Sequence, residues 1–105
     1  MDVLKALKTA NPERCKAFGH GDVNSWSPTD WACAIAGETG ELCNLVKKHH
    51  RGDKVAVSDM GKEAADIVIY LDLFCTRMGI DLQTAIVNKF NEVSERVNSP
   101  IKLVD

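Results

Sequence analysis

Hydrophobic residues recur every three or four positions along most of this chain, which is the spacing of one face of an α-helix. The two longest apolar stripes consist of Trp31, Ile35, Leu42 and Leu45, and of Met60, Ala64, Ile67, Leu71, Phe74 and Met78. Only residues 54–57 have the alternation of a strand, and that segment is too short to form a sheet. The pattern therefore predicts an all-α fold.

Capping and turn signals predict the bounds of the helices. Asn11 followed by Pro12 indicates the start of a short N-terminal helix. Long helices are expected from residues 27–30 to about 49, from 58 or 59 to 78, and from 81 to about 97. Gly79 ends the second of these, and Pro100 prevents the last from continuing. Three long helices and a shorter N-terminal one make up the predicted bundle.

The size and charge of the chain limit the classes of protein to which it can belong. Its 105 residues suit one domain, here residues 1–105, and a net charge of −2 gives no reason for tight binding to nucleic acid or to a membrane surface. No apolar run reaches membrane length, and the first residues lack a signal-peptide core. The four cysteines have no zinc spacing, so we expect reduced, structural cysteines in a cytoplasmic protein.

The segment from Ala64 to Cys75 is apolar almost all round its predicted helix. Such a helix is buried on more than one side. In a chain this small, the second side is most easily covered by another subunit. We therefore expect a homo-oligomer built from dimers, either a dimer or a tetramer.

Two pairs of acidic residues interrupt these apolar helices. Glu38 and Glu41 form one pair, and Glu63 and Asp66 form the other. Residues three apart share a helix face, so antiparallel packing of the two helices would bring four carboxylates together. Like charges about 4 Å apart repel by roughly 4 kcal/mol at an effective dielectric near 20. A cluster of this kind favours a divalent cation.

Two other interpretations of the acidic pairs stay open. The carboxylates could be solvated surface charges, or basic side chains could neutralise them. Lys47, Lys48 and Lys62 are the nearest candidates, and Lys62 could pair with Asp66 four residues on. If the site does hold a metal, its all-oxygen ligands suit Mg²⁺ or Mn²⁺. Carboxylate-held Mg²⁺ usually binds substrate phosphates, which indicates a phosphate-handling enzyme.

Several motifs resemble those of one enzyme family. They are Gly37-Glu-Thr-Gly-Glu-Leu42, Lys47-Lys48, Glu63-Ala-Ala-Asp-Ile-Val-Ile-Tyr70, Gly79-Ile-Asp-Leu82 and Lys89-Phe-Asn91. In this order they are similar to the MazG-like all-α nucleoside triphosphate pyrophosphohydrolases, which are related to dCTP pyrophosphatases and dimeric dUTPases. The resemblance extends over roughly residues 26–97.

The resemblance implies a helical bundle that hydrolyses a (d)NTP to the (d)NMP and pyrophosphate. It assigns Mg²⁺, with Mn²⁺ as a substitute, to Glu38, Glu41, Glu63 and Asp66. A metal there would activate a water for attack at the α-phosphate. Glu38 or Glu41 would accept the proton of that water.

The remaining candidates concern the substrate. Lys48, Arg51 and Lys89 are expected to bind phosphate oxygens, with Lys54 a weaker candidate, and Trp26, Tyr70 and Asn91 to contact the base or sugar. Each has a structural alternative: a solvated cation, a core aromatic or a capping amide. A non-catalytic helical interaction or regulatory module is the main competing hypothesis for the whole chain. A phosphohydrolase that acts on another pyrophosphate-linked substrate is a third.

Overall fold

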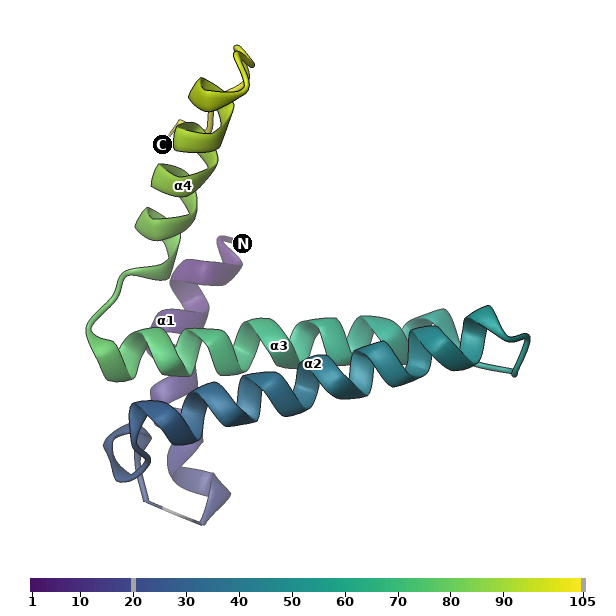
Figure 1. Ribbon diagram of the computed structural model, residues 1–105. Coiled ribbons are helices and arrows are strands. Elements are labelled where there is room, and N and C mark those ends of the chain that lie inside the picture. The colour runs from purple at the N-terminus through teal and green to yellow at the C-terminus, as the bar shows by residue number, and fades with distance from the viewer. Residues whose placement is uncertain (20, 105) are drawn as a thin grey trace.

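The computed structural model describes residues 1–19 and 21–104, and every long element in it is a helix. The elements are α1 (Val3–Cys15), the 3₁₀ turns η1 (Lys16–Phe18) and η2 (Val23–Ser25), α2 (Pro28–His50), α3 (Val57–Met78) and α4 (Leu82–Arg96) (Figure 1). No strand occurs in the described ranges. The all-α prediction is confirmed.

The helices form a hairpin with two attachments. α2 and α3 run antiparallel, α1 crosses the half of the hairpin where α3 ends, and α4 projects from that end as a separate arm (Figure 1). The radius of gyration is 16.2 Å, whereas a compact chain of this length has about 13 Å. The single chain is therefore far more extended than an independent globular domain.

Capping residues set the start of α2 and of α4 as expected. The Ser27 hydroxyl accepts the Asp30 N–H at 3.1 Å, and the Asp30 carboxylate accepts the Ser27 N–H at 2.9 Å. This reciprocal capping box satisfies two donors that the first helical turn leaves free. Asp81 caps α4, and Gly79, with φ of 71°, ends α3. These predicted bounds hold to within one or two residues.

The predicted start of the N-terminal helix is wrong. α1 begins at Val3, where the Asp2 carboxylate accepts the Lys5 N–H, and Pro12 lies inside the helix. Asn11 is buried and caps nothing. Its Nδ2 donates to the Ile69 carbonyl at 2.8 Å and to Asp72 Oδ2 at 2.9 Å. The Asn11 side-chain amide thus joins α1 to α3, whereas the Asn11–Pro12 pattern had predicted that it would cap a helix.

A small aromatic core lies where α1, η2, the start of α2 and the end of α3 meet. Trp31 is its centre, with Leu73, Cys15 and Val23 around it. The Trp31 indole Nε1 donates to the Val23 carbonyl at 2.9 Å, which fixes the loop before α2 against the hairpin. The core thus clamps one end of the hairpin, while the other half has only α2 against α3.

Much apolar surface stays uncovered in one chain. The accessible surface is 7245 Å², whereas about 5,800 Å² is expected for a folded monomer of this mass. On α3, Ala64, Ala65 and Val68 are exposed, although the sequence predicted burial on more than one side. The structure of one chain leaves that second side open, and the predicted homo-oligomer stays a prediction.

The Asn11 amide gives a direct test of how α1 is attached. Asn11→Ala leaves the Ile69 carbonyl and the Asp72 carboxylate without this donor, so it should lower the free energy of unfolding by about 2–4 kcal/mol. Urea unfolding at fixed protein concentration measures the loss. Asn44→Ala, at an exposed position of α2, is the matched control and should change it by less than about 0.5 kcal/mol. Equal effects of both substitutions would contradict the role of Asn11.

Candidate metal centre

Three of the four predicted metal ligands meet between α2 and α3. One carboxylate oxygen from each of Glu38, Glu41 and Glu63 lies within 4.8 Å of the other two. Glu38 and Glu63 are partly buried between the helices, and Glu41 is exposed at the edge. The i,i+3 spacing and the antiparallel hairpin therefore produce the expected convergence for these three residues.

Asp66 lies beside this group and is not part of it. Its negative charge contributes to raising the pKa of both Glu41 and Glu63. It also acts on Tyr70, whose pKa is raised first by burial and then by the charges of Glu38 and Asp66. The fourth acid and the tyrosine hydroxyl thus border the three-carboxylate cluster.

The surroundings of the cluster raise the pKa of two of its acids, Glu41 and Glu63. The pKa of Glu41 is raised chiefly by hydrogen bonding with Glu63, and then by the Glu63 charge. The pKa of Glu63 is raised mainly by desolvation and next by hydrogen bonding with Glu38, while hydrogen bonding with Glu41 partly offsets this. Neighbouring carboxylates that cannot all ionise retain a shared proton. The same crowding of carboxylates would favour a cation at this point.

Basic side chains do not neutralise the cluster in the described part of the chain. None of the ion pairs among the described residues includes one of the four predicted metal ligands. Lys62 pairs with Asp59 at 3.9 Å instead of with Asp66. One carboxylate oxygen of Glu63 is shielded from solvent and has no hydrogen-bond partner. Such an atom is unfavourable unless something binds it. Hard oxygen ligands with one orphaned atom fit Mg²⁺ or Mn²⁺.

Aromatic residues border the cluster on the side of the core. The rings of Trp31 and Tyr70 are 6.1 Å apart, and those of Trp26 and Trp31 are 4.5 Å apart. The Trp26 carbonyl also accepts the Arg77 Nε at 3.0 Å. Trp31 is a core residue, as expected. Trp26 packs on that core, and its expected contact with the base or sugar stays a prediction.

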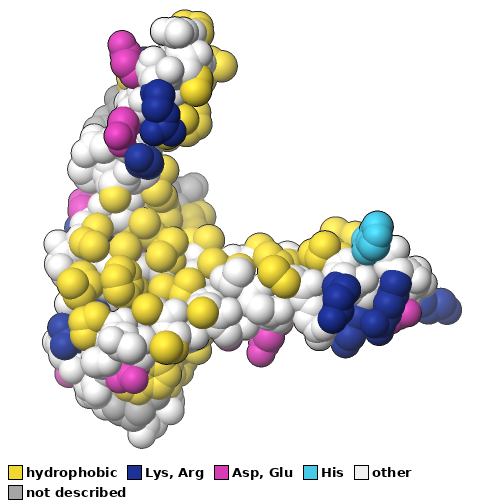
Figure 2. All heavy atoms as spheres, viewed as in Figure 1, with side chains coloured by type: hydrophobic (Ala, Val, Ile, Leu, Met, Phe, Trp, Pro, Cys, Tyr) yellow, Lys and Arg dark blue, Asp and Glu magenta, His cyan; other side chains and the backbone are white. Residues whose placement is uncertain are grey.

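Basic residues lie on the opposite side, toward the tip of the hairpin. Lys48 follows Glu41 by seven residues on the same face of α2, about 10 Å along the axis. Arg51, at the end of α2, pairs with Asp53 at 2.7 Å, and Lys54 is exposed. Figure 2 shows lysine and arginine side chains gathered at this tip. The cluster therefore lies between a basic tip and an aromatic base.

Lys89 and Asn91 are not brought to the cluster within one chain. Both lie on α4, which projects away from the hairpin (Figure 1). Lys89 pairs with Glu92 at 3.1 Å. The Asn91 amide donates to the Leu103 carbonyl at 2.9 Å and accepts the Leu103 N–H at 2.7 Å. The contacts of Asn91 in this structure hold the C-terminal segment on α4.

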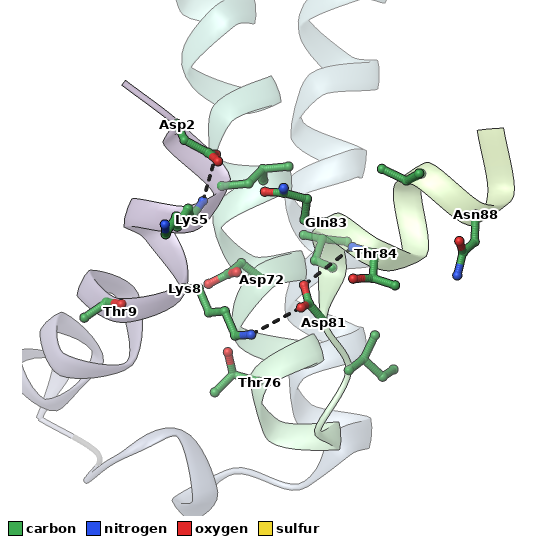
Figure 3. Close-up of a pocket in the computed structure, with 14 residues that line it drawn as sticks. Asp2, Lys5, Lys8, Thr9, Asp72, Thr76, Asp81, Gln83, Thr84 and Asn88 are labelled. Atoms are coloured by element: carbon green, nitrogen blue, oxygen red, sulfur yellow. Dashed lines mark hydrogen bonds and ion pairs between the residues drawn. The ribbon is translucent and has the colours of Figure 1, made fainter. Parts of the chain in front are cut away.

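A cavity of about 690 Å³ lies elsewhere, between the start of α1, the end of α3 and the start of α4 (Figure 3). None of the four acids of the metal centre lines it. Its wall includes the buried Asp72, and the Lys8–Asp81 pair spans 3.4 Å beside it. Sequence reasoning missed the Asn11–Asp72 bond, although a charged residue amid the apolar run of α3 was a usable signal.

Comparisons of the chain with models of protein families, with curated proteins and with solved structures gave no match. The likeness to the MazG-like enzymes consequently stays a prediction from the motifs. Among the described residues, no helix is both long enough and apolar enough to cross a membrane.

The raised pKa values predict an unusual pH dependence for the metal-free protein. The folded state binds more protons at Glu41 and Glu63 than the unfolded state does, so their contribution to stability falls as the pH rises above the unfolded value of about 4.3. In the presence of a chelator, Glu63→Gln should raise the Tm more at about pH 7.5 than at about pH 5. Thermal melts measure the difference. A larger gain at the lower pH would contradict this account.

Addition of a divalent metal should offset the loss of stability that the ionised carboxylates cause at high pH. At a hundred times its dissociation constant, Mg²⁺ or Mn²⁺ should add about 2.7 kcal/mol to the free energy of unfolding. Calorimetry and thermal melts test this, and Glu63→Gln should weaken binding. Glu13→Gln, an exposed acid of α1 that pairs with Lys16, is the control and should bind metal as the wild type does. Equal loss in both variants would point to nonspecific ion effects.

Proposed function

We propose that the protein is a Mg²⁺-dependent nucleotide pyrophosphohydrolase that converts a (d)NTP into the (d)NMP and pyrophosphate. The supporting observation is the convergence of Glu38, Glu41 and Glu63 on one point without a basic partner among the described residues. A structural cluster would be expected to carry compensating lysines or arginines. The oxygen ligands favour a cation that also binds phosphate.

Each acid has a proposed role. Glu38, Glu41 and Glu63 would hold the ion, with Asp66 beside them as the fourth proposed ligand. A bound ion would polarise phosphate oxygens and lower the pKa of a water. Glu41 is the exposed member of the cluster and has a raised pKa. It is therefore placed to accept the proton of the attacking water, with Glu38 as the alternative.

The basic tip of the hairpin and the aromatic residues at its other end indicate how a bound nucleotide would be oriented. The triphosphate extends toward Lys48 and Arg51 at the basic tip, and the base toward Tyr70 and Trp26. Arg51 would have to exchange its Asp53 partner for a phosphate oxygen. Lys89 and Asn91 would take part only where a further copy brings its α4 to this hairpin.

The assembly and location belong to the same proposal. The protein is a cytoplasmic homo-oligomer, a dimer or tetramer, in which the open apolar face of α3 packs on another copy. The uncovered Ala64, Ala65 and Val68 support this, because the second side of an apolar helix needs a cover.

A non-catalytic interaction or regulatory module is the second candidate. The observation in its favour is that Arg51, Lys89 and Asn91 all have partners within the chain, away from the acids. Such a module would keep the helices and show neither turnover nor stabilisation by metal.

Incubation with each dNTP and Mg²⁺, followed by measurement of pyrophosphate and monophosphate, separates the two candidates. Glu41→Gln and Asp66→Asn should each lower kcat/KM by roughly a hundredfold or more and leave the helical circular dichroism spectrum intact. Glu13→Gln is the control and should retain wild-type activity. If no dNTP is turned over and metal does not change the Tm, the interaction module is the better account.

A further inference from the structure

α4 is a helix almost without support from the rest of its own chain. Its fifteen residues leave the body where α3 ends (Figure 1). The Lys8–Asp81 ion pair, at the cap before its first turn, joins it to α1. Helices of this length are marginal in water unless they pack on something. The conformation of α4 therefore implies a partner surface.

One side of α4 is apolar and uncovered. Ile86, Phe90 and Val97 are 41%, 42% and 63% exposed, and Val93 lies between them on the same face. We call these four residues the α4 stripe. They line most of an apolar groove of about 560 Å³. Hydrophobic side chains follow one side of this arm and continue over the corner below it in Figure 2.

The C-terminal segment cannot cover the α4 stripe, because it is bound to another side of the helix. Asn91 holds the Leu103 backbone through two hydrogen bonds, and Lys102 contacts Glu95 and the Asn91 carbonyl. Asn91 and Glu95 lie roughly 140° and 180° around the helix from Ile86. Ile86, Phe90 and Val97 therefore stay exposed, with Ser94 and Ser99 beside them in the groove.

The uncovered area has the size of a subunit interface. The chain exposes 7245 Å², about 1,400 Å² more than a folded monomer of its mass. One side of a standard specific interface buries about 800 Å². Met78 and Ile80, at the junction of α3 and α4, are exposed as well. Every copy of the chain carries this same excess.

We propose that the α4 stripe is an interface with a second copy of this chain. A symmetric assembly removes the excess surface of both copies at once, which a small ligand could not do. The second copy thereby supplies the packing that α4 needs to remain helical. This inference rests on the proposed homo-oligomer and identifies α4 as part of its contact surface; it does not depend on hydrolysis or metal binding.

Light scattering and amide hydrogen exchange on the purified protein test the proposal. The wild-type mass should equal two or more chains, and the amides of α4 should be protected. Phe90→Asp should speed exchange in α4 by roughly tenfold or more and leave the amides of the α2–α3 hairpin less affected. Val104→Asp, at an exposed apolar position outside the stripe, is the matched control and should behave as the wild type.

A monomeric wild-type mass would overturn the proposal, and so would equal protection of α4 in the wild type and Phe90→Asp. If Phe90→Asp does not fold, Val97→Asp in the last turn of the stripe replaces it under the same criteria. Because neither nucleotide nor metal is present in these measurements, their outcome is independent of the proposed catalytic function.

Discussion

The mutual repulsion of carboxylates between α2 and α3 is the constraint on which the candidate site depends. Glu38, Glu41 and Glu63 approach one another because α2 and α3 pack side by side along the hairpin. Helix packing thus holds charges where electrostatics disfavours them. Hydrogen bonding with Glu63 and the Glu63 charge raise the pKa of Glu41, desolvation is the first cause that raises the pKa of Glu63, and one Glu63 oxygen has no partner. A bound divalent cation would offset the raised pKa values and give that oxygen a partner.

The rest of the fold serves to hold this hairpin at one end. The Trp31 core and the Asn11–Asp72 bond fix α1 and η2 against the last turns of α3. Beyond them the hairpin and α4 expose apolar faces to solvent. The chain has a radius of gyration of 16.2 Å and leaves apolar side chains exposed, which supports the proposed homo-oligomer. Only Lys89 and Asn91 would need assembly, because α4 of one chain projects away from its own hairpin (Figure 1).

Local signals predicted much of this arrangement, and tertiary contacts account for what they missed. The Ser27 capping box, the Asp81 cap and Gly79 act within one turn, so they were predictable from neighbouring residues. The convergence of Glu38, Glu41 and Glu63 followed from i,i+3 spacing and a short connection between antiparallel helices.

The position of Asn11 required knowledge of which part of α3 it meets, and the Asn11–Pro12 pair gave the wrong helix start. The hydrogen bonds between Asn91 and Leu103 depend likewise on the path of the C-terminal segment.

The central claim is that the carboxylates between α2 and α3 bind a divalent cation. Mn²⁺ binding followed by electron paramagnetic resonance tests it most directly. The account predicts that stoichiometric protein removes the free-ion signal and that Glu63→Gln restores it. An undiminished free-ion signal with folded wild-type protein would contradict it.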